Sequence, residues 1–476
     1  MVIESVLMTT CVSLSRMIHS EVKKGLVNQS QLGGVHMIYN PERETMGKVE
    51  KEALQLMLLK KTLNRAYYNN DYYKNAFDQA LVHPDDITSL EDIQKLPFLT
   101  KKDLRDHYPT GLFVKNVDIV RYHASSGTSG KPTITAYTKN DIDMWAECIA
   151  RSIVAAGCKE KGILHNAYGY GLFTGGLGLH HGAEKLGITT IPVSTGNTAR
   201  QILVINDLKP DILCSTPSYA LYLAEEMEAK GMDPSETSLK YGIFGAETWS
   251  EEMRQLLQEK LGIIAVDIYG LSEVVGPGVA IECAEAQDGL HIQEDYFYVE
   301  VIDPDTLEVL PEGEYGELVF TSLAKEAFPV IRYRSGDIAS ITREKCVCGR
   351  TTVRMSRPKG RVDDMLIIKG VNVFPSEVER SLLQVEELSP NYQLHLTKRG
   401  HIDHVELKVE VKEEFFKSVN HSLEDERIKE IERKLQTTIR NECLVNIDVN
   451  IVKPNTIPRS QGKAVRIIDE RMETVS

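Results

Sequence analysis

The sequence predicts an α/β protein in which a large N-terminal body, with parallel strand-helix layers plus an antiparallel layer, precedes a small α+β C-terminal lid. Between residues 163 and 270 short apolar runs alternate with stretches of helical spacing, which is typical of parallel strands joined by helical crossovers. After Gly289 apolar and polar residues alternate instead, as in 296–302 and 316–320, and this favours an antiparallel layer. Beyond Asp364 a shorter unit mixes helical and alternating patterns.

The parallel layer can be followed run by run. Its expected strands are residues 163–165, 188–193, 211–214, 241–244 and 263–269. Apolar residues at helical spacing predict crossover helices, among them 219–230 and 250–261. Binding loops gather beyond the carboxyl ends of parallel strands, so a site is expected near residues 247 and 269–273. The C-terminal unit is expected to contain a helix from Pro375, a strand 405–411, a helix 425–440 and a strand 445–451.

Composition excludes several classes of protein. Hydrophobic residues make up 42% and charged residues 26% of the 476 residues, which is ordinary for a globular chain large enough for more than one domain. The formal net charge of −14 argues against a nucleic-acid partner. No stretch approaches the roughly 20 apolar residues of a membrane span, and Glu4 stands where a signal peptide carries a basic residue. We therefore expect a cytoplasmic protein without a membrane partner.

Residues 125–133, Ser-Ser-Gly-Thr-Ser-Gly-Lys-Pro-Thr, have the composition of a phosphate-binding loop. The glycines let the backbone bend close to an anion, and Lys131 adds a mobile positive charge. Gly127 and Gly130 stand too close together for a Walker loop, and the segment lacks the G-x-G-x-x-G of dinucleotide folds. A flexible Ser/Gly linker is the alternative, although such linkers seldom end in Gly-Lys-Pro. The segment predicts a mobile loop over the triphosphate of a mononucleotide.

Further motifs follow this loop in order. They are Tyr-Gly-Leu-Ser-Glu at 269–273, Tyr-Arg-Ser-Gly-Asp at 333–337, Gly-Arg-Val-Asp-Asp at 360–364 and Gly-Lys at 462–463. Together with the loop, these motifs resemble the adenylate-forming enzymes. Within that superfamily, residues 166–180, 242–247 and 364–375 are similar to the phenylacetate-coenzyme A ligase family. The resemblance extends from about residue 39 to about residue 466.

The resemblance implies a two-step reaction on an aryl acid, with phenylacetate as the family's preference. ATP, bound with Mg²⁺, first converts the acid to an acyl-adenylate and releases pyrophosphate, and the thiol of coenzyme A then displaces AMP. Two alternatives stay open. One is a nucleotidyltransferase that adenylylates a deazaflavin coenzyme without coenzyme A, and the other is a non-catalytic nucleotide-binding protein. A homodimer is the oligomeric state that the resemblance suggests.

The resemblance also assigns residues to the nucleotide. The residues expected to grip the β- and γ-phosphates are Ser125, Ser126, Gly127, Thr128, Ser129, Gly130 and Lys131. Those expected around adenine are Gly245, Ala246, Glu247, Tyr269 and Gly270. Ser272 is expected to touch the α-phosphate, and Glu273 to supply the oxygen ligand that magnesium prefers. Asp337 suits a bidentate grip on the ribose hydroxyls, and Arg361 binds the nucleotide or orders a hinge.

Catalysis and domain motion are assigned in the same way. Lys463 is expected to bridge the substrate carboxylate and the α-phosphate, because a compact ammonium neutralises charge there. Asp363 is expected to be the hinge about which the lid rotates. The expected divisions are a variable extension at 1–38, disordered or preceding the true start, the body at 39–362 and the lid at 363–476.

The binding sites for the acid and for coenzyme A are less sharply marked. Tyr168, Tyr170 and Phe173 lie in a glycine-rich segment, where glycines would let a flat ring approach the backbone. Aromatic residues of an ordinary core are the competing interpretation. A basic cluster at Arg354, Arg357, Lys359 and Arg361 is a candidate phosphate site for coenzyme A. Alternatively, Arg361 orders the hinge and the other three form a solvated surface.

Four residues have the chemistry of a structural zinc site. Cys346 and Cys348 form a tight pair, and Cys283 lies eight residues before His291. Three thiolates and one imidazole suit tetrahedral zinc. Neither spacing is that of a standard zinc finger, so four buried but unligated side chains remain the alternative.

Overall fold

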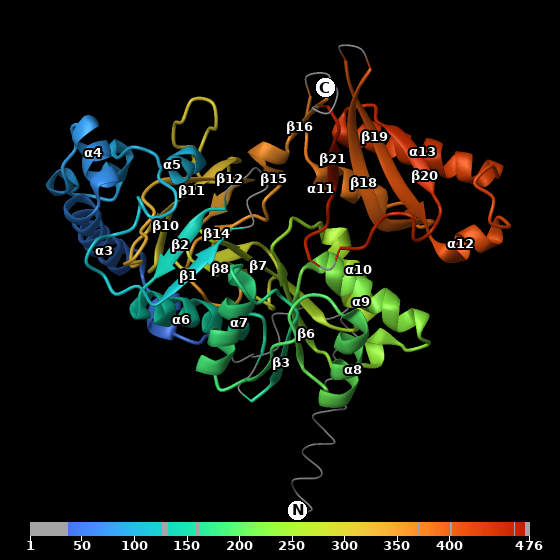
Figure 1. Ribbon diagram of the computed structural model, residues 1–476, viewed down its shortest axis with the longest axis horizontal. Coiled ribbons are helices and arrows are strands. Elements are labelled where there is room, and N and C mark those ends of the chain that lie inside the picture. The colour runs from blue at the N-terminus through green and yellow to red at the C-terminus, as the bar shows by residue number, and fades with distance from the viewer. Residues whose placement is uncertain are drawn as a thin grey trace, which may run out of the picture. The chain divides into compact units, whose positions relative to one another are not determined.

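The computed structural model describes residues 37–125, 132–158, 161–368, 371–399, 402–460 and 462–471. Residues 38–476 form one compact unit (Figure 1). The expected extension at 1–38 lies almost wholly outside the described residues, as do residues 126–131 of the phosphate loop. No described helix combines the length and apolar character needed to cross a bilayer.

A nine-stranded sheet forms the centre of the body, in the order β13-β14-β9-β8-β7-β6-β5-β3-β4. Its parallel strands are β3 (Ile163–Asn166), β4 (Thr189–Ile191), β5 (Ile212–Ser215), β6 (Tyr241–Gly245) and β7 (Ile264–Leu271). The antiparallel extension consists of β8 (Gly276–Glu282), β9 (Leu290–Ile292), β13 (Ile341–Thr342) and β14 (Arg354–Met355). All five predicted parallel strands are confirmed.

Helices cover both faces of this sheet because its strands are apolar on both sides. On β5, Ile212 and Cys214 pack into one core while Leu213 packs into another. The helices of the first core are α6 (Lys139–Ala155) and α7 (Thr174–Lys185). Those of the second face are α8 (Thr198–Leu208), α9 (Pro217–Ala229) and α10 (Glu251–Leu261), with the 3₁₀ turn η4 (Pro234–Glu236). The predicted helices at 219–230 and 250–261 are α9 and α10.

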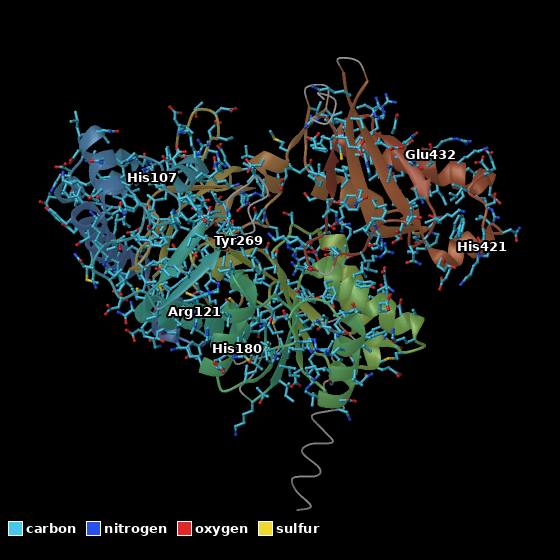
Figure 2. All side chains as sticks on the ribbon, in the orientation of Figure 1. His107, Arg121, His180, Tyr269, His421 and Glu432 are labelled. Atoms are coloured by element: carbon cyan, nitrogen blue, oxygen red, sulfur yellow. The ribbon has the colours of Figure 1, made fainter. Side chains whose placement is uncertain are left out.

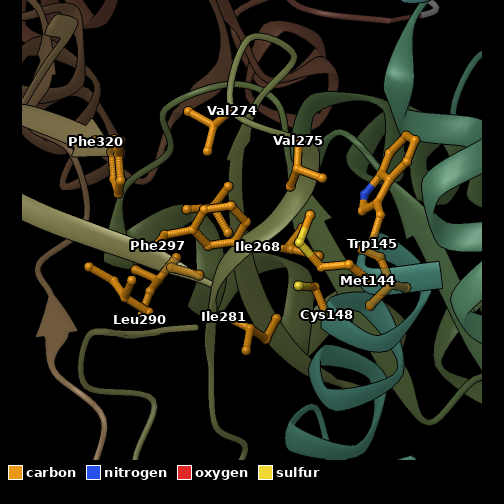
Figure 3. Packing of buried hydrophobic residues seen from close by; sticks show 14 of the residues in the cluster. Met144, Trp145, Cys148, Ile268, Val274, Val275, Ile281, Leu290, Phe297 and Phe320 are labelled. Carbon is orange, nitrogen blue, oxygen red and sulfur yellow. The ribbon is translucent and has the colours of Figure 1, made fainter. Parts of the chain in front are cut away.

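The first core joins α6 to the sheet (Figure 3). Trp145 and Cys148 of α6 belong to the same buried cluster as Ile268 and Ile281 of the sheet. The Trp145 ring nitrogen donates to the Pro277 carbonyl oxygen at 2.9 Å, so the indole is both buried and satisfied.

A second, antiparallel sheet contains β10 (Phe297–Ile302), β11 (Gly316–Ser322), β12 (Tyr333–Ala339) and β15 (Gly360–Arg361). The predicted antiparallel layer is thereby confirmed. A separate hairpin pairs β1 (Arg121–Ala124) with β2 (Ile134–Tyr137), and the phosphate loop connects its two strands.

The N-terminal helices pack against the second sheet. They are α2 (Pro41–Glu44), α3 (Lys48–Asn69), α4 (Asp71–Gln79) and α5 (Lys101–Asp106), with the 3₁₀ turns η2 (Pro84–Asp86) and η3 (Glu91–Lys95). Leu59 and Leu63 of α3 and Phe77 of α4 share a core with Leu323 and Ile331.

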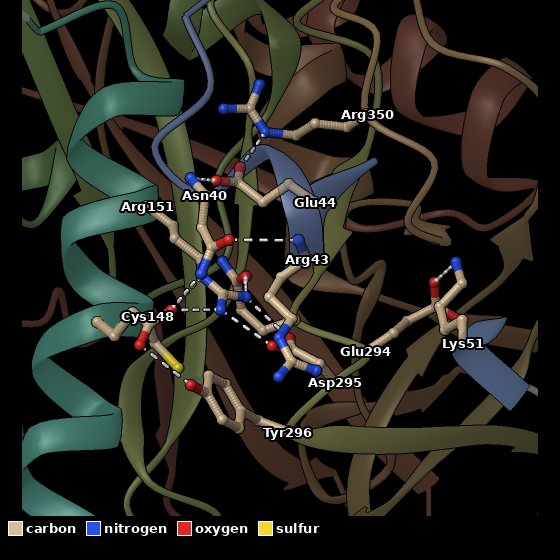
Figure 4. A network of polar contacts seen from close by, with 12 residues as sticks. Asn40, Arg43, Glu44, Lys51, Cys148, Arg151, Glu294, Asp295, Tyr296 and Arg350 are labelled. Carbon is tan, nitrogen blue, oxygen red and sulfur yellow. Dashed lines mark hydrogen bonds and ion pairs between the residues drawn. The ribbon is translucent and has the colours of Figure 1, made fainter. Parts of the chain in front are cut away.

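A buried polar network fastens the start of the described chain to the body (Figure 4). Arg151 of α6 forms a two-pronged ion pair with Asp295, at 2.8 and 2.9 Å. Asn40 donates to Glu147 at 2.9 Å, and Glu44 accepts from Arg350 at 2.6 Å. Burying a charge is costly unless it is paired, so these paired groups anchor Asn40 and Glu44 to the body.

The C-terminal part has a hydrophobic core of its own, formed by residues between 366 and 451. Its sheets are β20-β19-β18-β21 and β16-β17, built from β16 (Leu366–Ile368), β17 (Val371–Val373), β18 (Leu388–Arg399), β19 (Ile402–Val411), β20 (Asp448–Val452) and β21 (Ile467–Asp469). Its helices are α11 (Pro375–Leu383), α12 (Glu413–Ser418) and α13 (Glu426–Cys443), preceded by the 3₁₀ turn η5 (Val362–Asp364). The predicted α+β character is confirmed.

Candidate active site

Tyr269, Asp337 and Arg361 meet at the junction of the two body sheets. Tyr269, labelled in Figure 2, lies near the end of β7, and its hydroxyl donates to Asp337 Oδ2 at 2.6 Å. Asp337 of β12 stands opposite Arg361 of β15, whose guanidinium donates to Asp337 Oδ1 at 2.9 Å. Burial raises the pKa of Asp337, and Arg361 opposes this shift. The carboxylate has further acceptor sites, which suits the predicted contact with ribose.

The segment predicted to line adenine follows β6. A Cβ on Gly245 would lie 2.2 Å from the Ile268 carbonyl oxygen, so only glycine allows β6 to approach β7 here. Ala246 adopts a left-handed backbone with φ of 70°. The Glu247 carboxylate accepts from the backbone N–H groups of Ser218 and Ala464, both at 2.8 Å. Its hydrogen bonds therefore join the start of α9 to the loop that carries Lys463.

The loop around Lys463 reaches the nucleotide residues. Besides the bond from Ala464 to Glu247, Gly462 O accepts from the Thr216 hydroxyl at 3.0 Å. Water can reach the Lys463 side chain, yet protein atoms surround it closely enough that burial lowers its pKa, with a smaller contribution from Arg361. The carboxylates of Glu247, Asp337 and Glu273 favour the charged ammonium and so raise its pKa. The charges of the predicted ribose and magnesium ligands therefore act on Lys463.

Ser272 and Glu273 form a turn between β7 and β8. Both side chains are largely buried, and the Ser272 hydroxyl lies 3.1 Å from the hydroxyl of Thr174 at the start of α7. Tyr137 and Lys325 contact the backbone of the same turn, and the sequence analysis singled out neither. No sequence signal marks Lys325, because the charged Glu326 stands beside it.

The phosphate loop is held at its base. Ser125 N donates to the Thr133 carbonyl oxygen at 3.0 Å, and Thr133 N donates to Ser125 Oγ at 3.2 Å. Residues 126–131, which include Lys131, lie outside the described residues, so their contacts with phosphate stay a prediction.

The three aromatics predicted to form the acid pocket have different environments. Tyr168 is packed in the first core, as the competing interpretation proposed for these residues. The Tyr170 hydroxyl contacts Asn166 at 2.8 Å and His180 at 3.1 Å. Phe173 is half-buried and precedes α7, where a Cβ on Gly175 would lie 2.6 Å from its ring. The glycine therefore makes room for the protein's own phenyl ring.

Comparisons with known proteins agree with this arrangement. The family model described as "AMP-binding enzyme" matches residues 114–324, and that of the "AMP-binding enzyme C-terminal domain" matches residues 370–471. The phenylacetate-coenzyme A ligase of Thermus thermophilus is 48% identical over 444 residues, covering 91% of this chain and all of the relative. The chain belongs to the phenylacetate-coenzyme A ligase family. The phenylacetate-coenzyme A ligase of Escherichia coli is 51% identical over 430 residues, covering 90% of this chain and 97% of the relative.

One ligase has been solved in two conformational states, and this chain resembles one of those states more closely than the other. It is 2-hydroxyisobutyryl-CoA ligase, 28% identical, and the match covers 94% of this chain and 95% of that chain. The TM-score is 0.85 against its postadenylation state and 0.67 against its thioesterification state with CoA.

The four predicted zinc ligands of this ligase-family chain lie together. The ligand atoms of Cys283, His291, Cys346 and Cys348 are all buried and lie within 4.8 Å of one another. The sulfurs of Cys283 and Cys346 are 3.6 Å apart, and the Cys348 sulfur is 3.3 Å from His291 Nε2. Ligands of a tetrahedral zinc stand roughly 3.5–3.8 Å apart, given Zn–S near 2.3 Å. The other nitrogen of His291 lies 3.0 Å from the Thr352 hydroxyl, which is the kind of partner that orients metal-binding histidines.

The basic residues Arg354, Arg357 and Lys359 each contact an acidic or aromatic side chain of the protein. They border a cavity of about 660 Å³. Arg354 pairs with Asp288 at 2.8 Å, and Arg357 pairs with Glu251 at 3.1 Å. Lys359 lies 3.6 Å from the centre of the Tyr315 ring. Because these basic groups already have partners within the protein, we do not assign the cluster to coenzyme A binding.

Proposed function

We propose that this protein is an ATP-dependent acid:coenzyme A ligase that activates phenylacetate or a related aryl acid. It forms an acyl-adenylate with release of pyrophosphate, and then an acyl-coenzyme A thioester with release of AMP. The observation that carries the proposal is that the loop carrying Lys463 is hydrogen-bonded to Thr216 and Glu247 of the body, although these segments are far apart in the sequence. The names of the relatives at 48% and 51% identity support phenylacetate as the acid.

The described residues suit the first step. A carboxylate is a poor acyl donor because its charge repels nucleophiles, and transfer to AMP provides a good leaving group. Lys463 would lie between the acid and the α-phosphate and neutralise charge there, while Asp337 and Tyr269 hold the nucleoside. Glu273 would hold Mg²⁺, which neutralises phosphate charge when bound. The task of these side chains is therefore positioning and charge neutralisation.

The second step requires Lys463 to leave, and we propose that residues 363–476 rotate about Asp363. Asp363 forms an exposed ion pair with Lys101 of α5 at 2.6 Å, which joins the hinge to the body in this state. The closer similarity to the postadenylation state than to the thioesterification state of one ligase supports two arrangements of a shared fold. Glu247 would release the 462–464 loop on rotation.

A panel assay tests the proposed reaction. Pyrophosphate and AMP release are measured with phenylacetate, benzoate, 2-hydroxyisobutyrate and acetate, each with and without coenzyme A. We expect pyrophosphate release to require ATP and an arylacetic acid, and sustained AMP release to require coenzyme A as well. AMP transfer without coenzyme A to a deazaflavin acceptor would instead support the nucleotidyltransferase alternative, which nothing in the comparisons supports.

We also propose that Cys283, His291, Cys346 and Cys348 bind one structural zinc ion. Zinc bound only by the folded state would stabilise it. We expect about one zinc per chain in protein purified without chelators, and loss of that zinc together with a melting temperature lower by several degrees in Cys348→Ser. Elemental analysis and thermal unfolding measure both effects.

Cys214→Ser is the matched control for this zinc prediction. Cys214 is as fully buried as Cys348 but lies on β5, away from the cluster. The control is expected to lose some stability and to keep its zinc. Wild-type protein free of zinc would remove the proposal.

A further inference from the structure

Lys325 is a fully buried lysine close to the proposed magnesium ligand. It follows β11 and its exposed fraction is 0%. Among the described residues, no carboxylate lies within ion-pair distance of its ammonium. Burying an ammonium without such a partner is costly, so the position needs a physical reason beyond packing.

The ammonium contacts one carbonyl and two aromatic rings. Lys325 Nζ donates to the backbone oxygen of Glu273 at 3.1 Å. It also lies 4.7 Å from the ring centre of Tyr137 and 5.0 Å from that of Phe328, which is the range of cation–π attraction. These contacts direct the lysine at the turn between β7 and β8.

Tyr137 holds the same turn from the neighbouring strand β2. Its hydroxyl lies 2.9 Å from the Val275 carbonyl oxygen and 3.4 Å from that of Ser272. Trp145 donates to the carbonyl of Pro277, two residues beyond Val275. Buried side chains from three separate segments therefore contact the carbonyls of residues 272, 273, 275 and 277.

We infer that Lys325 and Tyr137 are positioning residues that fix the Glu273 turn for magnesium binding during adenylate formation. The inference rests on the proposed magnesium role of Glu273. Magnesium demands near-ideal octahedral geometry, so a ligand carboxylate must be held within about 0.5 Å of its place. Freeing the Glu273 carbonyl lets the turn move and misplaces that carboxylate.

Lys325→Met tests the inference because it keeps the chain length and removes the donor and the charge. At pH 8 we expect the magnesium concentration for half-maximal pyrophosphate release to rise at least tenfold. The rate of thioester formation from supplied phenylacetyl-adenylate should stay within twofold of wild type. A folded Lys325→Met protein with an unchanged magnesium requirement overturns the inference.

Three further variants keep the test decisive. Tyr137→Phe retains the ring and loses both hydroxyl contacts, so a roughly threefold rise is expected; if Lys325→Met does not fold, no change in Tyr137→Phe overturns the inference. Lys61→Met, at an exposed position on α3, is the control and should match wild type.

Glu273→Gln separates the two proposals. If Glu273→Gln raises the magnesium requirement and Lys325→Met and Tyr137→Phe do not, only the positioning role of Lys325 and Tyr137 is wrong. If Glu273→Gln has no effect, the magnesium role of Glu273 and the positioning role that depends on it are both wrong.

Discussion

Lys463→Ala is expected to lower the rate of adenylate formation by about 10²–10³-fold, the usual loss when one group that stabilises transition-state charge is removed. The 462–464 loop is hydrogen-bonded to Thr216 and Glu247 of the body, and the charges of Glu247, Asp337 and Glu273 act on the Lys463 ammonium. Thioester formation from supplied phenylacetyl-adenylate should fall by less than about threefold, because that step takes place after Lys463 has left. Pyrophosphate release measures the first step, and formation of the thioester measures the second.

The pH dependence gives the same prediction a second form. Burial and Arg361 lower the pKa of Lys463. As the pH rises, the rate of adenylate formation should therefore begin to decline at a lower pH than it would with a lysine of ordinary pKa. The decline follows because only the protonated form neutralises charge. Lys453→Ala, at an exposed position in the same C-terminal part, should leave both steps intact. Equal losses in the two half-reactions of Lys463→Ala would contradict the division of labour.

The sequence predicted the body sheet well because its strands are buried on both faces. The apolar runs that became β3, β5, β6 and β7 carry no polar alternation, and such runs between helical patterns have few other interpretations. The strand β18 escaped notice. Pro390 and Asn391 interrupt its alternation, and the pairing with β19 shifts register between Leu388 and Tyr392.

The site was predictable where a motif carries its own chemistry. Asp337 and Arg361 come together through the β12–β15 register, and Tyr269 of β7 bonds to Asp337 from the other sheet. The motifs named all three residues. The four cysteine and histidine residues proposed to bind zinc also come together, since β9 pairs with both β8 and β14 and so brings Cys283 and His291 toward the Cys346 turn. Lys325 could not be inferred, because its burial depends on rings from β2 and from residue 328 that only the tertiary fold supplies.

Gly270 was predicted as a nucleotide-binding residue, and the structure gives it a backbone role that makes it sensitive to substitution. A Cβ at this position would lie 1.9 Å from the Gly276 carbonyl oxygen and 2.7 Å from Pro277 Cα. Both neighbours are backbone atoms of β8, which cannot swing aside as a flexible side chain would. The pairing of β7 with β8 is already irregular between Tyr269 and Gly270.

We therefore expect Gly270→Ala to separate the two strands where the turn carrying Ser272 and Glu273 begins. Overpacking against backbone should lower the free energy of unfolding by about 3 kcal/mol. The same shift displaces Tyr269 and Glu273 in opposite senses around the new methyl group. A misplacement near 1 Å is enough to slow adenylate formation by about 10²-fold even in the folded fraction. Chemical denaturation and pyrophosphate release measure the two effects.

Gly47→Ala is the matched control, since a Cβ there meets nothing within 4 Å and its backbone φ of −65° suits any residue. Its adenylation rate should stay close to wild type, and its unfolding free energy should fall by no more than about 1 kcal/mol, because Gly47 is the N-cap of α3 and alanine caps less well. If Gly270→Ala behaves like this control, β8 must be free to move away from β7 without disturbing the turn. The clamp of Lys325 and Tyr137 argues against that freedom, because it holds the carbonyls of residues 273 and 275 on the β8 side of the new methyl group.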